Sequence, residues 1–312
     1  MEGVRSSIGF AAMDSMVFRT LEEWFMSQLK AGGAAALSET ERGDRLYAQA
    51  LLFLDQSKYA EGEVVAREAV EVLTRALGPE HGNTLASKYQ LAEFLHFQGK
   101  LAEAEALYAE VLEGRKHTLG PTHRDTLMTM SRMAGLLQEQ GKLAEAEALY
   151  AEVLEGCKRT LGPTHANTLT TMHAIAGLLQ EQGKLAEAEA LYAEVLEGRK
   201  RTLGPNHRDT LVCMRSFASV LQAQGKLIEA EGCYSECLEA MQRTLGRTNV
   251  GTLKTMAGFA QVREAQGRLA EAQAMLVDCV AGMRDVQRPE DADTEAVFCA
   301  AERQLEVLMQ RS

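Results

Sequence analysis

The segment Gly99-Lys-Leu-Ala-Glu-Ala-Glu-Ala-Leu-Tyr108 occurs again from Gly141 and from Gly183, and weaker copies begin at Gly225 and Gly267. Each copy begins 42 residues after the one before it, and a Leu-Gly-Pro element at residues 119–121 recurs with the same step. A fixed period of about 20–50 residues is typical of solenoids and other repeat arrays. We therefore expect six repeat units over residues 40–291, between an N-terminal segment, residues 1–39, and a C-terminal capping helix within residues 292–312.

Each unit has the pattern of two helices. Thr122, with Asp125 three residues later, is typical of a capping box at the start of the first helix. Gly141 predicts the end of that helix, because glycine adopts the left-handed conformation at little cost. Proline after Gly162 ends the second helix. Apolar residues recur every three or four positions between these points, as in two amphipathic helices, at Met130, Met133, Ala134, Leu137, Leu143, Ala146, Tyr150, Val153, Leu154 and Leu161.

Composition narrows the functional classes. The chain has 312 residues, of which 46% are hydrophobic and 25% charged, with a net charge of −11. Good helix formers dominate, which predicts an all-α protein. A nucleic-acid-binding protein needs a basic surface to neutralise phosphate, so the acidic balance argues against that class. The sequence has neither an apolar run long enough to span a bilayer nor a convincing secretory signal, so we expect a cytoplasmic protein without membrane contacts.

The spacing of small and large residues resembles the tetratricopeptide repeat family. In one unit Ala134, Leu137, Ala146 and Tyr150 occupy its characteristic positions, and Ala176, Leu179, Ala188 and Tyr192 do so in the next. The 42-residue period and the Leu-Gly-Pro-Thr-His element ending at His123 resemble the kinesin light chain subfamily in particular. The resemblance implies a right-handed α-solenoid whose first helices line a concave groove for peptides or partner segments.

Alignment to the family predicts which residues face this groove: Tyr47, Tyr89, Glu93, His96, Ser131, Gln138, His173, Gln180, Arg215, Gln222 and Gln261. Two family features are missing. The paired asparagines of kinesin light chains are replaced, for example by Tyr89-Gln90 and Ser131-Arg132. The segment before the repeats is too short for the family's long coiled coil, and its amphipathic stretch from Asp14 to Leu29 predicts one helix that caps the first repeat.

Other candidate sites are better explained structurally. Histidines recur at one loop position, where we expect each to support the entry turn of a first helix: His81, His123, His165 and His207. The six cysteines are expected to be free thiols and mostly buried, because a metal site near Cys233 and Cys237 would need further ligands. No nucleophile motif or phosphate-binding loop occurs. We therefore expect no metal, no cofactor and no enzymatic activity.

The repeats vary mainly in their first helices. Residues 98–127 and 182–211 differ at only two positions, whereas Ser131-Arg-Met-Ala corresponds to His173-Ala-Ile-Ala and to Arg215-Ser-Phe-Ala. A constant scaffold with a varied inner surface suits a binding groove, and drift after duplication explains the same pattern equally well. We expect Tyr89, His173 and Arg215 to be largely exposed, with His173 making affinity depend on pH near neutrality.

The sequence thus favours a non-catalytic interaction scaffold that binds a protein or peptide in the concave groove. Two alternatives stay open. One is a cargo adaptor like the kinesin light chains, and the other is an architectural solenoid that self-associates. The missing asparagine pairs and coiled coil argue against the adaptor, and a mass that depends on concentration would favour self-association.

Overall fold

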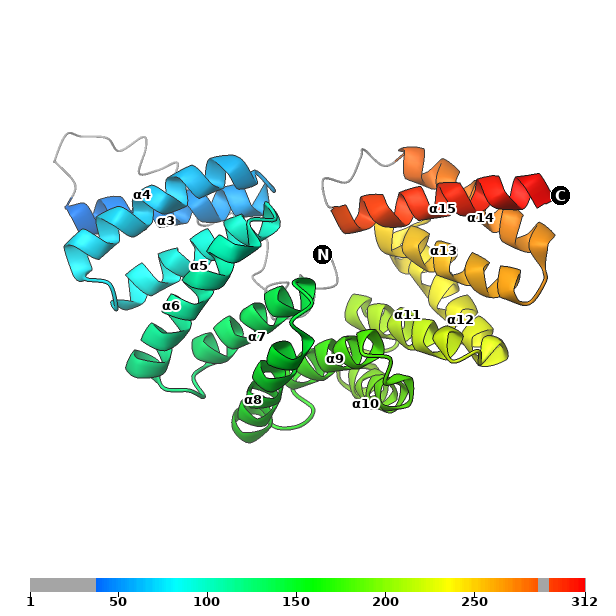
Figure 1. Cartoon of the computed structure of the whole chain (residues 1–312), viewed down its shortest axis with the longest axis horizontal. Coiled ribbons are helices and arrows are strands. Elements are labelled where there is room, and N and C mark those ends of the chain that lie inside the picture. The colour runs from blue at the N-terminus through cyan, green and yellow to red at the C-terminus, as the bar shows by residue number, and fades with distance from the viewer. Residues whose placement is uncertain (1–37, 286–291, 312) are drawn as a thin grey trace. The chain divides into compact units, whose positions relative to one another are not determined.

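The structure is a computed structural model that describes residues 38–285 and 292–311. Every regular element in these residues is an α-helix (Figure 1). The helices are α3 (Glu39–Asp55), α4 (Tyr59–Leu77), α5 (Gly82–Phe97), α6 (Leu101–Leu119), α7 (Arg124–Glu139), α8 (Leu143–Leu161), α9 (Ala166–Glu181), α10 (Leu185–Leu203), α11 (Arg208–Ala223), α12 (Leu227–Leu245), α13 (Val250–Ala265), α14 (Leu269–Asp285) and α15 (Ala292–Arg311). The prediction of an all-α helical repeat is confirmed.

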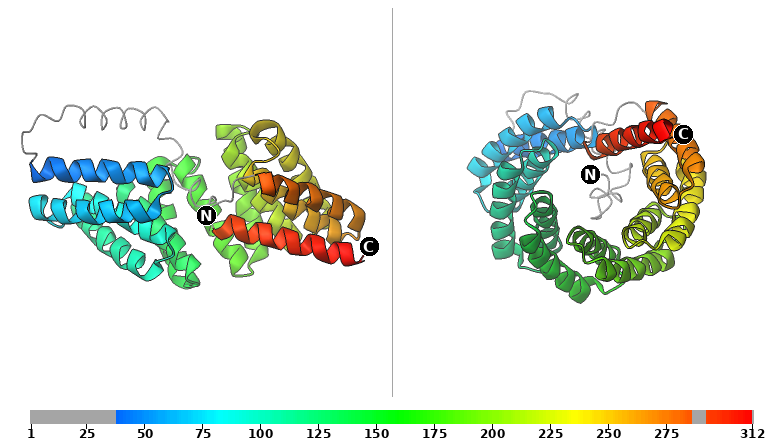
Figure 2. Two further views of the ribbon diagram at one scale, coloured as in Figure 1. Left: turned by 90° about the horizontal axis from the view of Figure 1, so that it is seen from above. Right: turned by 45° about the vertical axis from the view of Figure 1, so that its right-hand side comes forward.

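The described helices form two compact units. The first holds α3–α8, within residues 38–163, and the second holds α9–α15, within residues 164–311. In each unit every helix packs against the next one in the chain, which is the contact pattern of a repeat array. Figure 2 shows α14 and α15 side by side at the end of the second unit. None of the helices in the described ranges is long and apolar enough to cross a membrane.

The first helices α7 and α11 begin one residue later than the sequence predicted. The N-cap of α5, α7, α9 and α11 is the recurrent histidine, whereas Ser38 caps α3 and Asn249 caps α13. The Nδ1 atom of His123 accepts a hydrogen bond from the backbone N–H of Asp125 at 3.2 Å, and the Nδ1 atom of His207 accepts one from Asp209 at 3.2 Å. The expected capping box at Thr122 is therefore wrong, because the imidazole occupies the position from which a side chain reaches the second helical N–H. The expected role of these histidines in the entry turn is confirmed.

The helix ends match the glycine signals. Gly141 follows α7 with a backbone φ of 76°, and Gly162 follows α8 with a φ of 90°. Residues that have a Cβ atom rarely adopt such positive φ values. Within each repeat the predicted apolar stripe forms the core, including Met130, Ala134 and Ala146. Leu161 is the exception, because it is the last residue of α8 and is 42% exposed.

One close approach between helices was not predicted. The Cα of Gly156 in α8 lies so near α7 that an added Cβ would stand 2.6 Å from Cδ2 of Leu127. The same arrangement joins Gly198 of α10 to Leu169 of α9, at 2.8 Å. Glycine lets the two helices of a repeat pack closely at this level. At the C-terminal end, α15 buries Ala301 and Leu308 against the core that α13 and α14 form. The capping helix predicted for residues 14–29 lies outside the described residues.

Candidate functional site

The eleven predicted groove residues differ widely in exposure. Tyr89, Glu93, His96 and Ser131 are buried, and only Gln261 is exposed. The remaining six are half-buried: Tyr47, Gln138, His173, Gln180, Arg215 and Gln222. All eleven lie on first helices, as predicted, but in the two units they form different arrangements.

In the first unit the predicted residues belong to a buried ionic cluster. Glu93 of α5 lies 3.5 Å from the guanidinium of Arg132 of α7, and each side chain is about 5% exposed. The hydroxyl of Tyr108 donates a hydrogen bond to the same carboxylate. Burial alone would lower the pKa of Arg132, but the charge of Glu93 outweighs it and raises the pKa. Glu93 therefore has its hydrogen-bonding partners within the protein.

Tyr89 and His96 are also held by neighbouring side chains. Tyr89 is only 6% exposed, with its ring 5.0 Å from the guanidinium carbon of Arg115 and edge-on to Tyr108. His96 lies 2.9 Å from a carboxylate oxygen of Glu139 on α7. The expectation that Tyr89 is largely exposed is wrong, because Arg115 of α6 covers its ring. The repeat alignment placed Tyr89 on the correct helix, but it could not show that the side chain of Arg115 lies over the ring.

His173 of α9 is half-buried and its ring packs edge-on against Tyr192, with the ring centres 5.1 Å apart. Its Nδ1 atom is buried and has no hydrogen-bond partner. Burial lowers the pKa of His173, and the nearby charges of Arg199 and Arg215 lower it further, to about 3. The expectation that His173 titrates near neutral pH is therefore wrong: the imidazole is neutral there.

Polar side chains join the first helices of the second unit. The amide of Gln180 in α9 donates to the hydroxyl of Ser219 in α11 at 3.2 Å. The amide of Gln222 in α11 donates to Gln261 in α13 at 3.2 Å. The sequence analysis did not include Ser219, although it occupies the same repeat position as Glu93 and Gln261. We call Gln180, Ser219, Gln222 and Gln261 the amide ladder. Its members are neutral, and each has hydrogen-bonding capacity beyond these contacts.

Arg215 lies beside this ladder on α11. No hydrogen bond or ion pair joins its side chain to any residue in the described part of the chain, although it is half-buried. The contrast with Arg132 and Arg199 is clear, since Arg132 pairs with Glu93 and Arg199 donates to the carbonyl oxygen of Asp209 at 2.9 Å. The expectation that Arg215 is largely exposed is wrong, but its guanidinium keeps its full donor capacity.

Gly135 and Gly177 lie at the same repeat position within the first helices α7 and α9. A Cβ added to Gly135 would stand 3.5 Å from the hydroxyl oxygen of Tyr150, and one added to Gly177 would stand 3.4 Å from that of Tyr192. Both distances are ordinary van der Waals contacts. Close helix packing therefore does not require glycine at either position, in contrast to Gly156.

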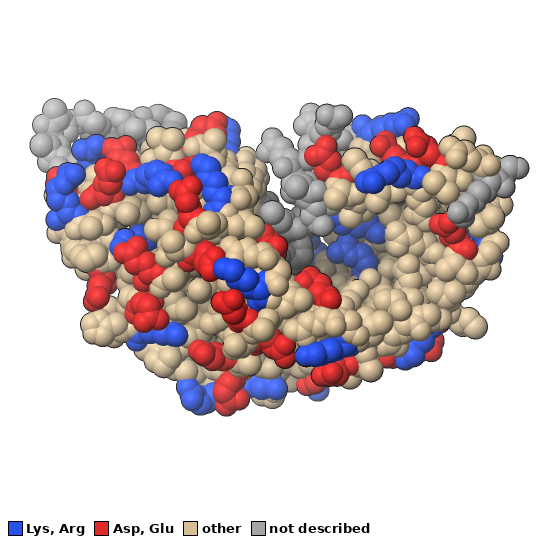
Figure 3. Space-filling model, in the orientation of Figure 1, with Lys and Arg blue, Asp and Glu red and all other residues tan. Residues whose placement is uncertain are grey.

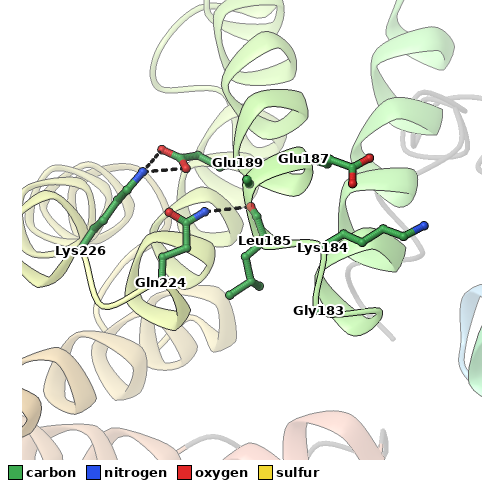
Figure 4. Close-up of a pocket in the computed structure, with 8 residues that line it drawn as sticks. Gly183, Lys184, Leu185, Glu187, Glu189, Gln224 and Lys226 are labelled. Carbon is green, nitrogen blue, oxygen red and sulfur yellow. Dashed lines mark hydrogen bonds and ion pairs between the residues drawn. The ribbon is translucent and has the colours of Figure 1, made fainter.

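A shallow depression of about 520 Å³ lies between the turn before α10 and the turn before α12 (Figure 4). Several of its polar groups are paired with one another. Lys226 contacts both carboxylate oxygens of Glu189, at 2.6 and 2.7 Å, and Gln224 donates to the carbonyl oxygen of Leu185 at 2.9 Å. The same type of clamp recurs between Lys142 and Glu105. The depression is thus part of the contact between successive repeats.

Glu63 occupies the same repeat position as Glu105 and Glu189, and among these three carboxyl groups its pKa is lowered most. Burial raises the pKa of this carboxyl group, but hydrogen bonds from Lys100, Arg67 and Gln98 outweigh burial and lower the pKa to about 2.

Elsewhere on the surface, Figure 3 shows acidic and basic side chains interspersed over the helices of the first unit. Among residues 38–285 and 292–311, no group of three His, Cys, Asp or Glu side chains is placed to hold a metal ion. All six cysteines are free, and Cys157, Cys213, Cys237 and Cys279 are buried.

Comparison with known families identifies the repeats. The sequence profile of the tetratricopeptide repeat family matches residues 45–117, 85–134, 125–201, 173–226 and 215–285. The chain belongs to this family. Its repeats are the helix pairs that recur every 42 residues, and the second helices α6, α8, α10 and α12 each bury an alanine and a tyrosine at equivalent positions. Comparison with curated proteins found no significant match.

Several solved structures share the fold. A putative kinesin light chain from Podosopora anserina with nearly identical repeats is 23% identical, with a TM-score of 0.59, covering 68% of this chain and 99% of that one. BtubC (BKLC) from P. vanneervenii is 18% identical, with a TM-score of 0.61, covering 75% and 94%. NprR in complex with its cognate peptide NprX is 13% identical, with a TM-score of 0.66, covering 96% and 89%. These proteins confirm the resemblance in fold to kinesin light chain-like repeat proteins.

Proposed function

We propose that this tetratricopeptide repeat protein is a non-catalytic interaction scaffold that binds a peptide or partner segment along the first helices of its second unit. The observation that carries the proposal is the amide ladder, because it places neutral hydrogen-bonding groups on three successive first helices. An extended backbone exposes alternating donors and acceptors, which amide side chains can match. The buried cluster around Glu93 in the first unit has its partners within the protein and offers fewer free groups.

The fold family supports a peptide or protein partner. NprR binds its cognate peptide NprX, and Rap protein forms a complex with Competence and Sporulation Factor. We therefore propose a peptide or protein partner that is recognised by hydrogen bonding and shape.

The test is affinity capture from a lysate of the source cells, read by quantitative mass spectrometry. The variant Gln180→Ala/Gln222→Ala/Gln261→Ala removes three ladder amides and should lose the partners that the natural chain captures. A matched control, Glu194→Ala/Glu197→Ala/Glu229→Ala, truncates three exposed polar side chains on the second helices α10 and α12. Loss of partners in the control with retention in the ladder variant would place binding on the second helices and contradict the proposal.

A cargo-adaptor function is a second candidate, favoured by the 42-residue period and the shared fold with the putative kinesin light chain. It predicts that motor or cytoskeletal proteins are among those captured. The buried state of Tyr89 and Ser131 disfavours it in the first unit, because these side chains replace asparagines that would face cargo in that subfamily.

A further inference from the structure

The helix α3 has an apolar face that the described helices cover only in part. It packs against α4 and α5 at the start of the first unit (Figure 1), and it buries Gly43 and Ala50 there. Ala48, Leu51 and Leu52 lie together on another side of α3, because residues three or four apart share a helix face. All three are only half-buried. We call these three residues the open face of α3.

The repeat position of Leu52 is fully buried where another repeat precedes it. Leu52 corresponds to Phe94 of α5 and to Leu136 of α7, and both of these side chains are completely buried. A Cβ added to Gly62 of α4 would collide with the ring of Phe94. The position therefore packs against the second helix of the preceding repeat. Among the described residues no helix precedes α3, so its open face lacks that contact.

Residues 14–29 of the same chain have the pattern needed to cover this face. Apolar side chains recur every three or four positions in the segment, as on one side of a helix, at Met16, Val17, Leu21, Trp24, Phe25 and Leu29. A helix of these 16 residues would extend about 24 Å, and α3, with 17 residues, extends about 26 Å, at about 1.5 Å per residue. The two helices match in length.

The place of the segment in the chain restricts where it can bind. Eight residues, 30–37, join Leu29 to Ser38, which is the N-cap of α3. Fully extended, this connection reaches about 30 Å at most. Helix connections of about two to eight residues usually join antiparallel neighbours. The segment therefore has α3 itself within reach as an antiparallel neighbour.

From these observations we propose that residues 14–29 form an amphipathic helix that docks antiparallel to α3 and covers its open face, with Trp24 in the contact. The docked helix takes the place that α4 has beside Phe94. Docking removes apolar surface of both partners from water, which stabilises the contact in proportion to the buried area. The contact does not involve the amide ladder, so the inference is independent of the proposed function.

Trp24 is the only tryptophan of the chain, so its fluorescence reports on this contact in the full protein. In the natural chain its emission should lie at short wavelength and resist quenching by acrylamide. Leu52→Gln, which removes an apolar group from the open face, should shift the emission to longer wavelength and increase the quenching. The matched control Leu161→Gln makes the same change at an exposed leucine of the same unit and should alter neither.

A second pair of variants changes the segment and leaves every repeat intact. Leu21→Gln should expose Trp24, whereas Glu23→Gln, on the polar side of the segment, should not. Circular dichroism verifies folding, and this pair decides the question if Leu52→Gln does not fold. An exposed Trp24 in the natural chain, or an emission that neither Leu52→Gln nor Leu21→Gln changes, overturns the proposal. Burial of Trp24 that increases with protein concentration also overturns it, because the segment would then dock on a second copy.

Discussion

The first helices of the two units use the same repeat positions differently. In the first unit, Glu93 and His96 find partners on α7, at Arg132 and Glu139, and the cluster is buried. In the second unit, the equivalents of Glu93 and His96 in α11 are Ser219 and Gln222, which are neutral and half-buried. The same repeat position can thus form a buried ion pair in one unit and carry a neutral, half-buried side chain in the other.

The largest expected difference between the units comes from truncating one arginine in each. Arg132→Ala should lower the free energy of unfolding by about 3–5 kcal/mol, because it leaves Glu93 buried and unpaired. Arg215→Ala should cost about 0.5 kcal/mol or less, since it breaks no contact of the arginine. Urea denaturation followed by circular dichroism measures both. Equal losses of stability in the two variants would mean that Arg132 and Arg215 do not differ in their contribution to folding, which contradicts the comparison of the two units.

Overpacking the helix pair should affect both units alike. Ala146 and Ala188 are fully buried at equivalent positions of α8 and α10. Changing either one to leucine should cost about 1–3 kcal/mol, because the added atoms have no space in a packed core. The exposed control Glu187→Leu should cost far less. A clear difference between the two alanines would show that the scaffold itself differs between the units.

Acid should destabilise the second unit through His173. The pKa of this group is about 3 in the folded chain and about 6.5 in the unfolded chain, so the unfolded state binds more protons below pH 6.5. Its contribution to stability is therefore complete above pH 6.5 and falls as the pH is lowered towards 3. At pH 5.5 the loss amounts to about 1 kcal/mol. Urea denaturation at pH 7.5 and 5.5 checks this.

The control for the acid effect is His173→Gln, which has no imidazole to titrate. Its stability should change less between the two pH values than that of the natural chain. The Glu63 clamp in the first unit does not interfere, because hydrogen bonds lower its pKa to about 2 and its contribution fades only below the pH range used. The same pH dependence in both proteins would contradict a half-buried His173 that is neutral at pH 7.

A small effect is expected at the helix caps. His123→Ala in the first unit and His207→Ala in the second each remove one acceptor from a helical N–H, which should cost about 0.5–1 kcal/mol. His123→Asn and His207→Asn should restore most of the loss, since the Oδ1 atom of Asn249 caps α13 by accepting a 2.9 Å hydrogen bond from the backbone N–H of Gly251. Failure of asparagine to rescue would show that the imidazole stabilises the turn in another way.

The helix pairs, their approximate bounds and the apolar stripe of the core can be predicted from the amino-acid sequence alone. These follow from local rules, namely the spacing of apolar residues, glycine at helix ends and proline after them. Which polar residues on the first helices keep free hydrogen-bonding groups depends on contacts between helices that are distant in the sequence. The partners of Glu93 and His96 lie on α7, 39 and 43 residues further along the chain, and Arg115 covers Tyr89 from a different helix. Repeat register specifies the face of a helix, whereas burial and pairing depend on side chains that another repeat contributes.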